Sequence, residues 1–143
     1  MSIDDCRVVK LRKIGDVRGN LTVIEGAKDI PFEIKRIYYI YDVPAGEYRG
    51  AHAHRKLEQL MVAVSGSLDV SVDDGMERKT FSLNRPYEGF YIPKMTWRDM
   101  GNFSSGSVCL VLASEFYEES DYLRDYDEFL RIAKGEKNGN QTG

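Results

Sequence analysis

Short apolar runs, divided by polar and turn-forming residues, make up most of this chain. Within these runs β-branched and aromatic residues are frequent, which is typical of strands. The runs lie in residues 36–43, 57–83, 89–97 and 107–114. The last of them, SVCLVLAS, is almost continuously apolar and predicts a strand buried on both faces. Many short strands at close spacing predict an all-β fold, either an antiparallel barrel or a sandwich.

Turn-forming residues mark the ends of the predicted strands. Pro44-Ala45-Gly46 closes the first run, and Ser65-Gly66 divides the segment 57–83. Further along that segment, Asp73-Asp74-Gly75 lies between alternating runs, and an Asp-Gly pair in this position predicts a β-hairpin.

The segment 120–135 follows a helical period instead. Ser120 is a suitable N-cap, and Gly135 is a suitable residue to end the helix. Apolar side chains recur at helical spacing and predict a stripe that packs on the barrel; they are Tyr122, Tyr126, Phe129 and Ala133. The polar sequence EKNGNQTG that follows is typical of a disordered tail. We therefore expect one domain over residues 1–135 and a tail over 136–143.

Composition narrows the class of protein. A length of 143 residues suits one domain with one core. The net charge of -3 gives no basic surface for nucleic acid, and no apolar run approaches the roughly 20 residues of a membrane helix. Because the N-terminus is charged where a signal peptide would be apolar, a cytoplasmic protein is expected. Cys6 and Cys109 lie far apart and are expected to be reduced, structural thiols.

Both histidines lie in one stretch, RGAHAHRKLEQ (49–59). Side chains alternate along a strand, so a single strand over 51–64 would place its even-numbered residues on one face. These are His52, His54, Lys56, Glu58, Leu60, Val62 and Val64. Such a face begins polar and ends apolar, as expected of a strand that runs from the open end of a barrel into its packed interior. Two imidazoles, an ammonium and a carboxylate at that open end indicate a functional site, and a hydrogen-bonded polar patch on an exposed strand is the alternative.

The same stretch resembles the first motif of the cupins, which are small jelly-roll barrels. The matching residues are Gly50, His52, His54, Glu58 and Gly66. A second cupin motif would add a third histidine, but RPYEGFYIPKMTW (85–97) supplies Pro86, Gly89 and Pro93 without one. Because a cupin metal centre usually uses that imidazole, catalysis without a metal is expected and a metal-dependent dioxygenase is disfavoured. A weakly bound ion on a His-His-Glu set stays open as an alternative.

Several separate segments resemble the sugar-nucleotide 3,4-ketoisomerases. They are DVRGNLTVIE, RIYYIYDVPAGEYRGAHAH, RGAHAHRKLEQ, the central DDG hairpin and VLASEFYEESDYLRDYDEF, and they cover roughly residues 8–132. The resemblance implies an RmlC-like cupin, a jelly-roll β-barrel with one C-terminal α-helix. It also implies an isomerase, without metal or organic cofactor, that moves the ketone of TDP-4-keto-6-deoxy-D-glucose from carbon 4 to carbon 3 through an enediol.

Assembly and pathway are further implications of the resemblance. The family serves pathways to TDP-linked 3-amino-3,6-dideoxy sugars of lipopolysaccharide O-antigens or surface-layer glycans, where a sugar aminotransferase acts downstream. Its members usually form homodimers that exchange N-terminal strands. In this chain CRVVKLRKI would be that strand, with apolar positions Val8, Leu11 and Ile14.

The resemblance also implies roles for residues that move protons. Imidazole can take and return protons near neutral pH. His54 is the expected base for carbon, and His52 is its partner on oxygen. Tyr39 resembles the family tyrosine beside the histidines and is expected to donate to the enediolate oxygen, although Tyr39 and Tyr41 on the same face are equally compatible with core aromatics.

Substrate binding is expected from a second group of residues. Arg18 and Arg49 are the expected ligands of the pyrophosphate, since guanidinium groups bind it in a bidentate manner. The remaining members of the expected set are Lys56, Glu58, Trp97 and Arg98. Arg98 occupies a position where some family members have histidine, which implies the gluco configuration at carbon 4, whereas Arg18 also suits the galacto-forming branch.

Two other functions remain open at this point. A TDP-sugar 3,5-epimerase also removes protons beside a ketone, but such enzymes pair one histidine with an aspartate and a distal tyrosine. A cupin-type module that binds a sugar nucleotide without catalysis is the alternative from another class. The sequence has no DNA-binding segment, which argues against such a non-catalytic module.

Overall fold

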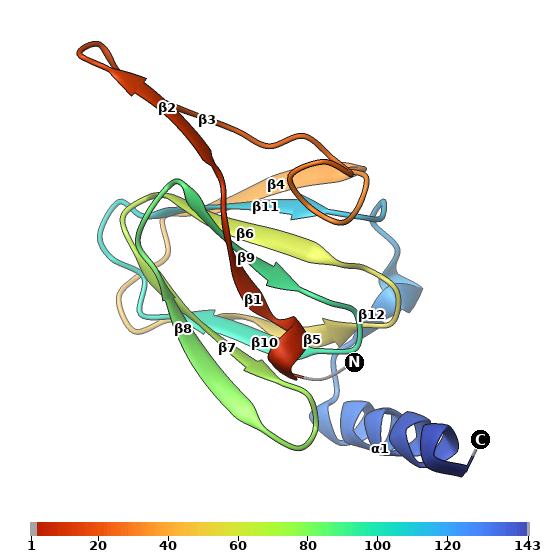
Figure 1. The fold of residues 1–143 in the computed structure, drawn as a ribbon. Helices are drawn as coiled ribbons and strands as arrows, with labels where there is room; N and C mark the ends of the chain where they lie inside the picture. Colours follow the sequence, from red (N-terminus) through yellow and green to blue (C-terminus); the bar gives the residue numbers. More distant parts are fainter. Residues whose placement is uncertain (1–2, 143) are drawn as a thin grey trace.

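A computed structural model of the chain describes residues 3–142, with side chains for residues 3–135. Two five-stranded antiparallel sheets lie face to face and form a jelly-roll barrel (Figure 1). The first sheet has the strand order β1-β9-β6-β11-β4, and the second has the order β12-β5-β10-β7-β8. The pair β2-β3 forms a hairpin that projects from the barrel (Figure 1). The predicted all-β barrel with a C-terminal helix is confirmed.

The elements have the following bounds. The first sheet consists of β1 (Arg7–Lys10), β9 (Glu88–Ile92), β6 (Gln59–Ser65), β11 (Val108–Ala113) and β4 (Arg36–Tyr41). The second sheet consists of β12 (Tyr122–Leu123), β5 (Arg49–His54), β10 (Trp97–Gly101), β7 (Leu68–Asp73) and β8 (Arg78–Leu83). The hairpin consists of β2 (Arg12–Asp16) and β3 (Gly19–Val23), and the helical elements are η1 (Ile3–Asp5), η2 (Glu119–Asp121) and α1 (Tyr126–Thr142).

The apolar pattern explains how the two sheets form one core. The apolar run 107–114 becomes β11, which lies between β6 and β4 and has both faces covered. Cys109 and Val111 enter the barrel core, whereas Leu112 packs in a second cluster on the outer face of the first sheet. The Asp73-Asp74-Gly75 turn joins β7 to β8 as an antiparallel hairpin, as predicted.

The segment 51–64 is not the single strand that the histidine pattern suggested. It is divided between β5 in the second sheet and β6 in the first, and residues 55–58 form the corner between them. Alternation holds within a strand but is reset where the chain bends into another sheet. On β6 the odd-numbered Met61 and Ala63 therefore enter the barrel core, and the even-numbered Leu60 and Val62 face the outer cluster.

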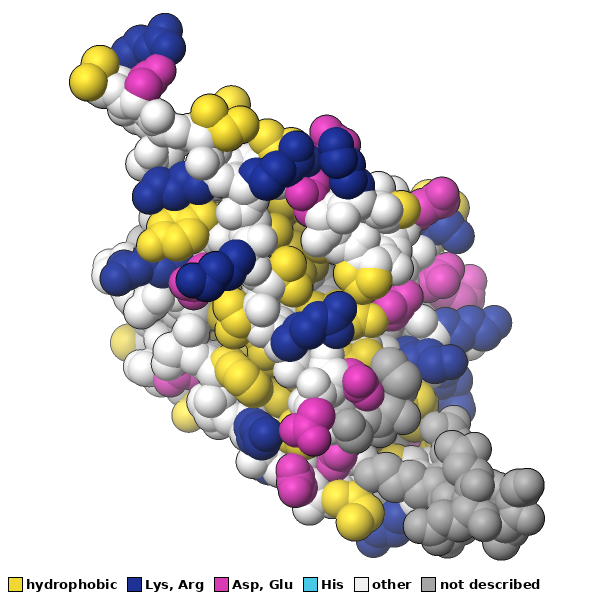
Figure 2. All heavy atoms as spheres, in the orientation of Figure 1, with side chains coloured by type: hydrophobic (Ala, Val, Ile, Leu, Met, Phe, Trp, Pro, Cys, Tyr) yellow, Lys and Arg dark blue, Asp and Glu magenta, His cyan; other side chains and the backbone are white. Residues whose placement is uncertain are grey.

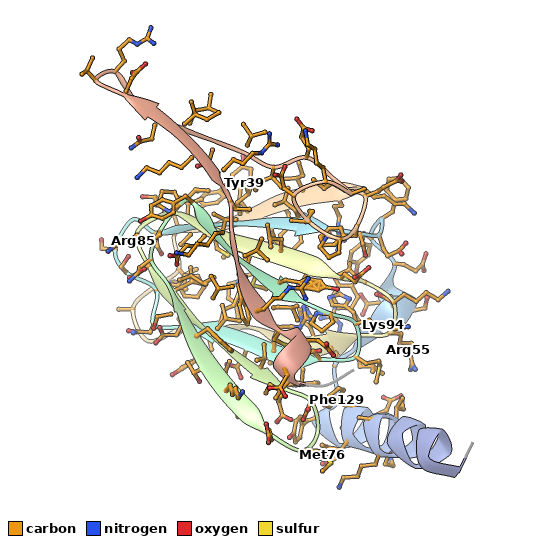
Figure 3. All side chains as sticks on the ribbon, in the orientation of Figure 1. Tyr39, Arg55, Met76, Arg85, Lys94 and Phe129 are labelled. Carbon is orange, nitrogen blue, oxygen red and sulfur yellow. The ribbon has the colours of Figure 1, made fainter. Side chains whose placement is uncertain are left out.

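The C-terminal helix begins later than the sequence pattern predicted. Ser120 and Asp121 lie in η2, and Tyr122 lies in β12, where it pairs with His54 of β5. Pairing with a free strand edge therefore overrides the helical spacing of Tyr122. The remainder of the predicted stripe is confirmed, since Phe129 and Ala133 of α1 pack with Trp97 on the outer face of the second sheet (Phe129 is labelled in Figure 3).

The helix also ends later than predicted. The backbone of α1 continues through Gly135 to Thr142, so the predicted disordered tail is helical over residues 136–142, and residue 143 lies outside the described residues. One glycine lowers helix stability by about 1 kcal/mol relative to alanine, which does not force the helix to end. Within residues 3–142, no helix has the length and apolar character that crossing a bilayer requires.

The N-terminal segment divides into two strands at Leu11, where one was predicted. β1 pairs with β9 of the same chain, and β2 pairs with β3 in the projecting hairpin. Hydrophobic side chains on this hairpin are exposed (Figure 2), among them Ile14 and Leu21, which are 61% and 55% exposed. The hairpin thus carries apolar surface away from the barrel.

Candidate active site

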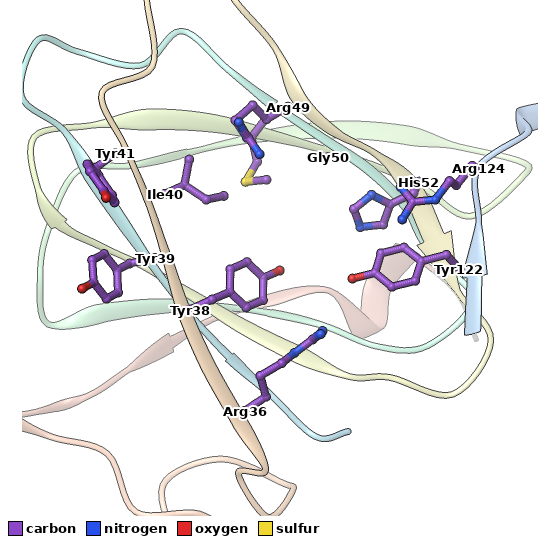
Figure 4. A pocket seen from close by; sticks show the side chains of 11 residues that line it. Arg36, Tyr38, Tyr39, Ile40, Tyr41, Arg49, Gly50, His52, Tyr122 and Arg124 are labelled. Carbon is purple, nitrogen blue, oxygen red and sulfur yellow. The ribbon is translucent and has the colours of Figure 1, made fainter. Parts of the chain in front are cut away.

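A cavity of about 520 Å3 lies between β4, β5, β10 and β12 (Figure 4). Its walls combine aromatic rings with the guanidinium groups of Arg36, Arg49 and Arg124. Gly50 forms part of the wall with φ of 77°, a left-handed conformation that favours glycine. The cavity is therefore polar, cationic and large enough for a small ligand.

The two histidines lie at one end of this cavity. Their rings meet edge to face with centroids 4.8 Å apart, and the Tyr122 ring lies 5.0 Å from His52 and 4.4 Å from His54. His52 lines the cavity, whereas His54 lies behind it and is fully buried. Burial and the nearby Arg98 lower the pKa of His52 to about 3 and hold the pKa of His54 well below its usual range. Both imidazoles are therefore neutral at neutral pH.

Arg98 lies in the interior behind the histidines and is fully buried. Its Nη1 donates to Gln59 Oε1, and Gln59 Nε2 donates to the Tyr38 hydroxyl at 2.8 Å. Burial lowers the pKa of Arg98 to about 10, so the guanidinium remains charged at neutral pH. A hydrogen-bonded chain therefore connects a buried cation to the hydroxyl of Tyr38 in the cavity wall.

Four buried polar atoms have no hydrogen-bond partner among the described residues. They are His54 Nε2, Arg98 Nη2, Arg36 Nε and Arg36 Nη2. Buried polar groups are normally paired, and an unpaired group calls for an explanation. All four belong to residues in or directly behind the cavity, so they are suited to a polar ligand.

Tyr38, and not the predicted Tyr39, points toward the histidines. In Figure 4 the Tyr38 hydroxyl is directed toward His52 and Tyr122, whereas Tyr39 and Tyr41 are directed away. Along β4 the residues Arg36, Tyr38 and Ile40 are half-buried, and the alternate residues are exposed. Tyr39 and Tyr41 share one face, as expected, and both line the cavity, but the hydroxyl that is directed toward the histidines is that of Tyr38. Tyr39 is 62% exposed.

Three other expected substrate ligands lie away from the histidines. Lys56 lines a separate cavity with Arg55 and Phe116. Glu58 accepts a hydrogen bond from the Tyr91 hydroxyl on the outer face of the first sheet. Both differences follow from the corner at 55–58, which ends the common face assumed for a single strand. Trp97 points outward from β10 and packs against α1, because the inward positions of that strand are those of Arg98 and Met100.

The two arginines expected to bind pyrophosphate are placed differently. Arg49 lines the same cavity as His52. Arg18 lies between β2 and β3 at the end of the projecting hairpin, where its side chain is 86% exposed and pairs with Asp16. The structure thus brings together His52, His54, Arg49 and Arg98 of the predicted set.

No group of three or more His, Cys, Asp or Glu side chains within residues 3–135 has an arrangement that could hold a metal ion. This agrees with the position of Glu58, which is bonded to Tyr91 on the outer face of the first sheet.

A protein-family model described as FdtA: WxcM-like, C-terminal, matches residues 4–134 of the chain. The chain belongs to this family. A curated relative from Aneurinibacillus thermoaerophilus, named TDP-4-oxo-6-deoxy-alpha-D-glucose-3,4-oxoisomerase, is 48% identical over 129 residues, which is 90% of this chain and 93% of the relative. The resemblance to sugar-nucleotide 3,4-ketoisomerases is thereby confirmed.

Solved structures agree with this assignment. WlaRB from Campylobacter jejuni, a TDP-quinovose 3,4-ketoisomerase, is 51% identical with a TM-score of 0.87 over 90% of this chain and 99% of its own. WlaRA from the same organism, a TDP-fucose-3,4-ketoisomerase, is 36% identical with a TM-score of 0.86 over 90% and 96%. A dTDP-4-dehydrorhamnose 3,5-epimerase from Bacillus anthracis has a TM-score of 0.73 over 82% of this chain and 77% of its own. It is only 16% identical, so the likeness shows the fold alone.

The sequence analysis did not include several residues of the cavity and its surroundings in the expected site; they are Arg36, Tyr38, Gln59, Asp121, Tyr122 and Arg124. The run RIYYIY has apolar residues on both faces, so its pattern does not reveal which face is inside. Gln59 did leave a signal, as a polar residue inside an apolar run. The segment that contains Asp121 follows a helical period, which concealed its position beside β5.

Proposed function

We propose that this chain is a TDP-sugar 3,4-ketoisomerase that converts TDP-4-keto-6-deoxy-D-glucose to the 3-keto isomer. The observation that carries the proposal is the position of a neutral imidazole, His52, opposite the hydroxyl of Tyr38 in one cationic cavity. The 48% identity to an enzyme named for this oxoisomerase reaction supports the substrate class.

The reaction needs one group that serves carbon and one that serves oxygen. His52 takes the proton from carbon 3, the electron pair of that bond forms the carbon 3–carbon 4 double bond, and the Tyr38 hydroxyl gives its proton to the carbonyl oxygen of carbon 4. In the resulting enediol, the hydroxyl on carbon 3 returns a proton to Tyr38 and becomes the new ketone. His52 then returns its proton to carbon 4, and both side chains regain their starting states.

The protonation states suit these roles. Burial raises the pKa of Tyr38, so its hydroxyl is a proton donor at neutral pH. The positive charge of Arg98, relayed through Gln59, stabilises the negative charge that develops on Tyr38 and on the sugar oxygen. This assignment reverses the expectation from sequence, in which His54 served carbon, because His52 lines the cavity and His54 does not.

The diphosphate is assigned to the cations of the same cavity. Arg49 and Arg124 are exposed residues that line the cavity with His52, and Arg36 contributes two buried guanidinium atoms without a partner among the described residues. Guanidinium groups are suited to bidentate phosphate contacts. Arg124 also stacks on Tyr122 at 4.3 Å and pairs with Glu119 at 2.8 Å, so it is held in place before a ligand binds.

The product is proposed to have the gluco configuration at carbon 4. Arg98 supports this through the family resemblance, and the 51% identical TDP-quinovose enzyme supports it over the 36% identical TDP-fucose enzyme, since quinovose is 6-deoxyglucose.

We also infer a cytoplasmic reaction that uses no metal or organic cofactor, followed by an aminotransferase, because a ketone at carbon 3 is the group that amination requires.

A homodimer is proposed from the projecting hairpin. Ile14 and Leu21 on the hairpin are exposed, and so are Ile37 and Tyr39 on the outer face of the edge strand β4. Burial of these side chains between two copies would favour association. Arg18 at the hairpin tip would then contact the diphosphate in the cavity of the partner, which explains its distance from the cavity of its own chain.

The test is the identity of the product from TDP-4-keto-6-deoxyglucose, followed by 13C NMR. We expect the carbonyl carbon to change from carbon 4 to carbon 3. A product that keeps its ketone at carbon 4 with inverted neighbours would show a 3,5-epimerase instead. Tight TDP binding without any conversion would show a binding module.

A further inference from the structure

Asp121 connects the corner at 55–58 to the inner histidine. Its carboxylate accepts hydrogen bonds from the backbone N–H groups of Lys56 at 2.7 Å and Leu57 at 3.3 Å, and its Oδ2 lies 3.1 Å from His54 Nδ1. The carbonyl of Asp121 accepts a further hydrogen bond from the N–H of Arg55 at 2.9 Å. Four contacts therefore hold Asp121 in one position against His54.

This contact determines where the single ring proton of a neutral His54 lies. Burial is the main cause that lowers the pKa of His54 and keeps it neutral, and the neighbouring groups that add to it are Arg98, His52, Arg36 and Arg124. A carboxylate can only accept a hydrogen bond, so Nδ1 must carry the proton. Nε2 then has a free lone pair, and it is one of the buried atoms without a partner among the described residues.

We propose that Asp121 is a positioning residue that fixes the Nδ1–H tautomer of His54 and so keeps Nε2 as an unprotonated hydrogen-bond acceptor directly behind the histidine end of the cavity. The effect of this acceptor on catalysis rests on the proposed function, but the tautomer does not. Arg98, whose charge acts on His54, has a second buried atom without a partner among the described residues, the donor Nη2.

The substitution Asp121→Asn should reverse the tautomer. An asparagine side chain has one oxygen acceptor, and the shorter bond to the Lys56 N–H, at 2.7 Å, will retain it. The amide NH2 then occupies the place of Oδ2 and donates to His54 Nδ1. The ring proton must therefore move to Nε2, which changes the inner histidine from an acceptor to a donor.

The tautomer can be read directly, because the chain has 2 histidines and therefore four ring nitrogens. We would record long-range 15N–1H correlations of protein labelled with 15N-histidine, without substrate, and assign His54 with the His52→Asn variant. The expected result is a protonated Nδ1 and an unprotonated Nε2 in the wild type, and the reverse in Asp121→Asn. A protonated Nε2 in the wild type would overturn the proposal.

Kinetics test the consequence for catalysis. Asp121→Asn should lower kcat by about 10–100-fold, typical of residues that orient a functional histidine, while the Kd for TDP changes less than about twofold. The matched control is Asp125→Asn, because Asp125 Oδ1 accepts from the N–H groups of Asp127 and Glu128 at the start of α1, and asparagine caps a helix equally well. This control should retain wild-type kcat.

Failure of the two proposals would look different. If the wild type converts no keto sugar but shows the Nδ1–H tautomer, the proposed function fails and the positioning by Asp121 stands. If the wild type is active and Asp121→Asn keeps both the tautomer and kcat, the positioning fails and the function stands.

Discussion

Replacing Tyr38 with phenylalanine removes one hydroxyl from the cavity and leaves the ring in place. That hydroxyl accepts from Gln59 Nε2 at 2.8 Å and is directed toward His52 (Figure 4). The neighbouring substitution Tyr39→Phe is a matched control, because it removes the same atom from a side chain that is 62% exposed. The pair therefore tests which face of β4 is functional.

Both the kcat and the melting temperature of Tyr38→Phe should be lower than those of the wild type. Loss of a general acid typically costs about 10²–10⁴-fold in kcat. Gln59 is fully buried, so its amide would lose a partner in the interior, which costs roughly 1–3 kcal/mol of unfolding free energy. For a chain of this size that corresponds to a melting temperature lower by about 2–10 °C.

The assay is turnover of TDP-4-keto-6-deoxyglucose followed by NMR, with calorimetry on the same samples. Tyr39→Phe should keep kcat within about threefold of the wild type, because Tyr39 lines the cavity with its hydroxyl directed away from the histidines and the substitution keeps its ring. The reasoning would be refuted if Tyr38→Phe retained its turnover, or if Tyr39→Phe were the variant that lost it.

Further predictions concern pH, metals and assembly. The pKa of His52 is about 3 instead of the ordinary 6.5, so His52 stays an unprotonated base on acidification. The value of kcat/KM should therefore be nearly constant from pH 7.5 to about 5. A kcat/KM that falls to half its maximum at pH 6.5 would contradict this. The same pKa shift makes stability depend on pH. Below pH 6.5 the unfolded chain takes up a proton on His52 that the folded chain does not. The melting temperature should therefore be constant above pH 6.5 and fall as the pH drops toward 3. Turnover should survive exhaustive treatment with EDTA, and loss of activity that an added divalent ion restores would overturn the metal-free mechanism. Light scattering should report a dimer. Mixing the inactive variants Arg18→Ala and His52→Asn should restore activity, because a mixed dimer has one site with both His52 and Arg18. If activity does not recover, Arg18 does not contribute to the cavity of the partner.

The fold could be predicted from the sequence because short-range patterns survive into the structure. The Asp-Gly turn, the apolar run of β11 and the stripe of α1 depend on neighbouring residues, and each is confirmed. The histidine pair was also found in this way, because His52 and His54 lie on one strand. Such features need no knowledge of distant contacts.

The rest of the site depends on where the chain bends, which alternation does not reveal. The corner at 55–58 separates Lys56 and Glu58 from the histidines, and no residue type marks it unambiguously. On β4 both faces carry aromatic residues, so the choice between Tyr38 and Tyr39 is made by the partner strand β11 and the core behind it. Asp121 reaches His54 because β12 pairs with β5, a contact across 67 residues of sequence.

The central claim is that His52 moves a proton between two neighbouring carbons of the sugar. The most direct measurement is the position of deuterium in the product when TDP-4-keto-6-deoxyglucose is incubated in deuterated water with wild-type protein and with His52→Asn. On prolonged incubation, in which the proton held by His52 exchanges with solvent, the account predicts that the wild type places deuterium at carbon 4 of a 3-keto product. His52→Asn should introduce no deuterium at carbon 3 or carbon 4. Deuterium at carbon 5, or exchange in His52→Asn at the wild-type rate, would contradict it.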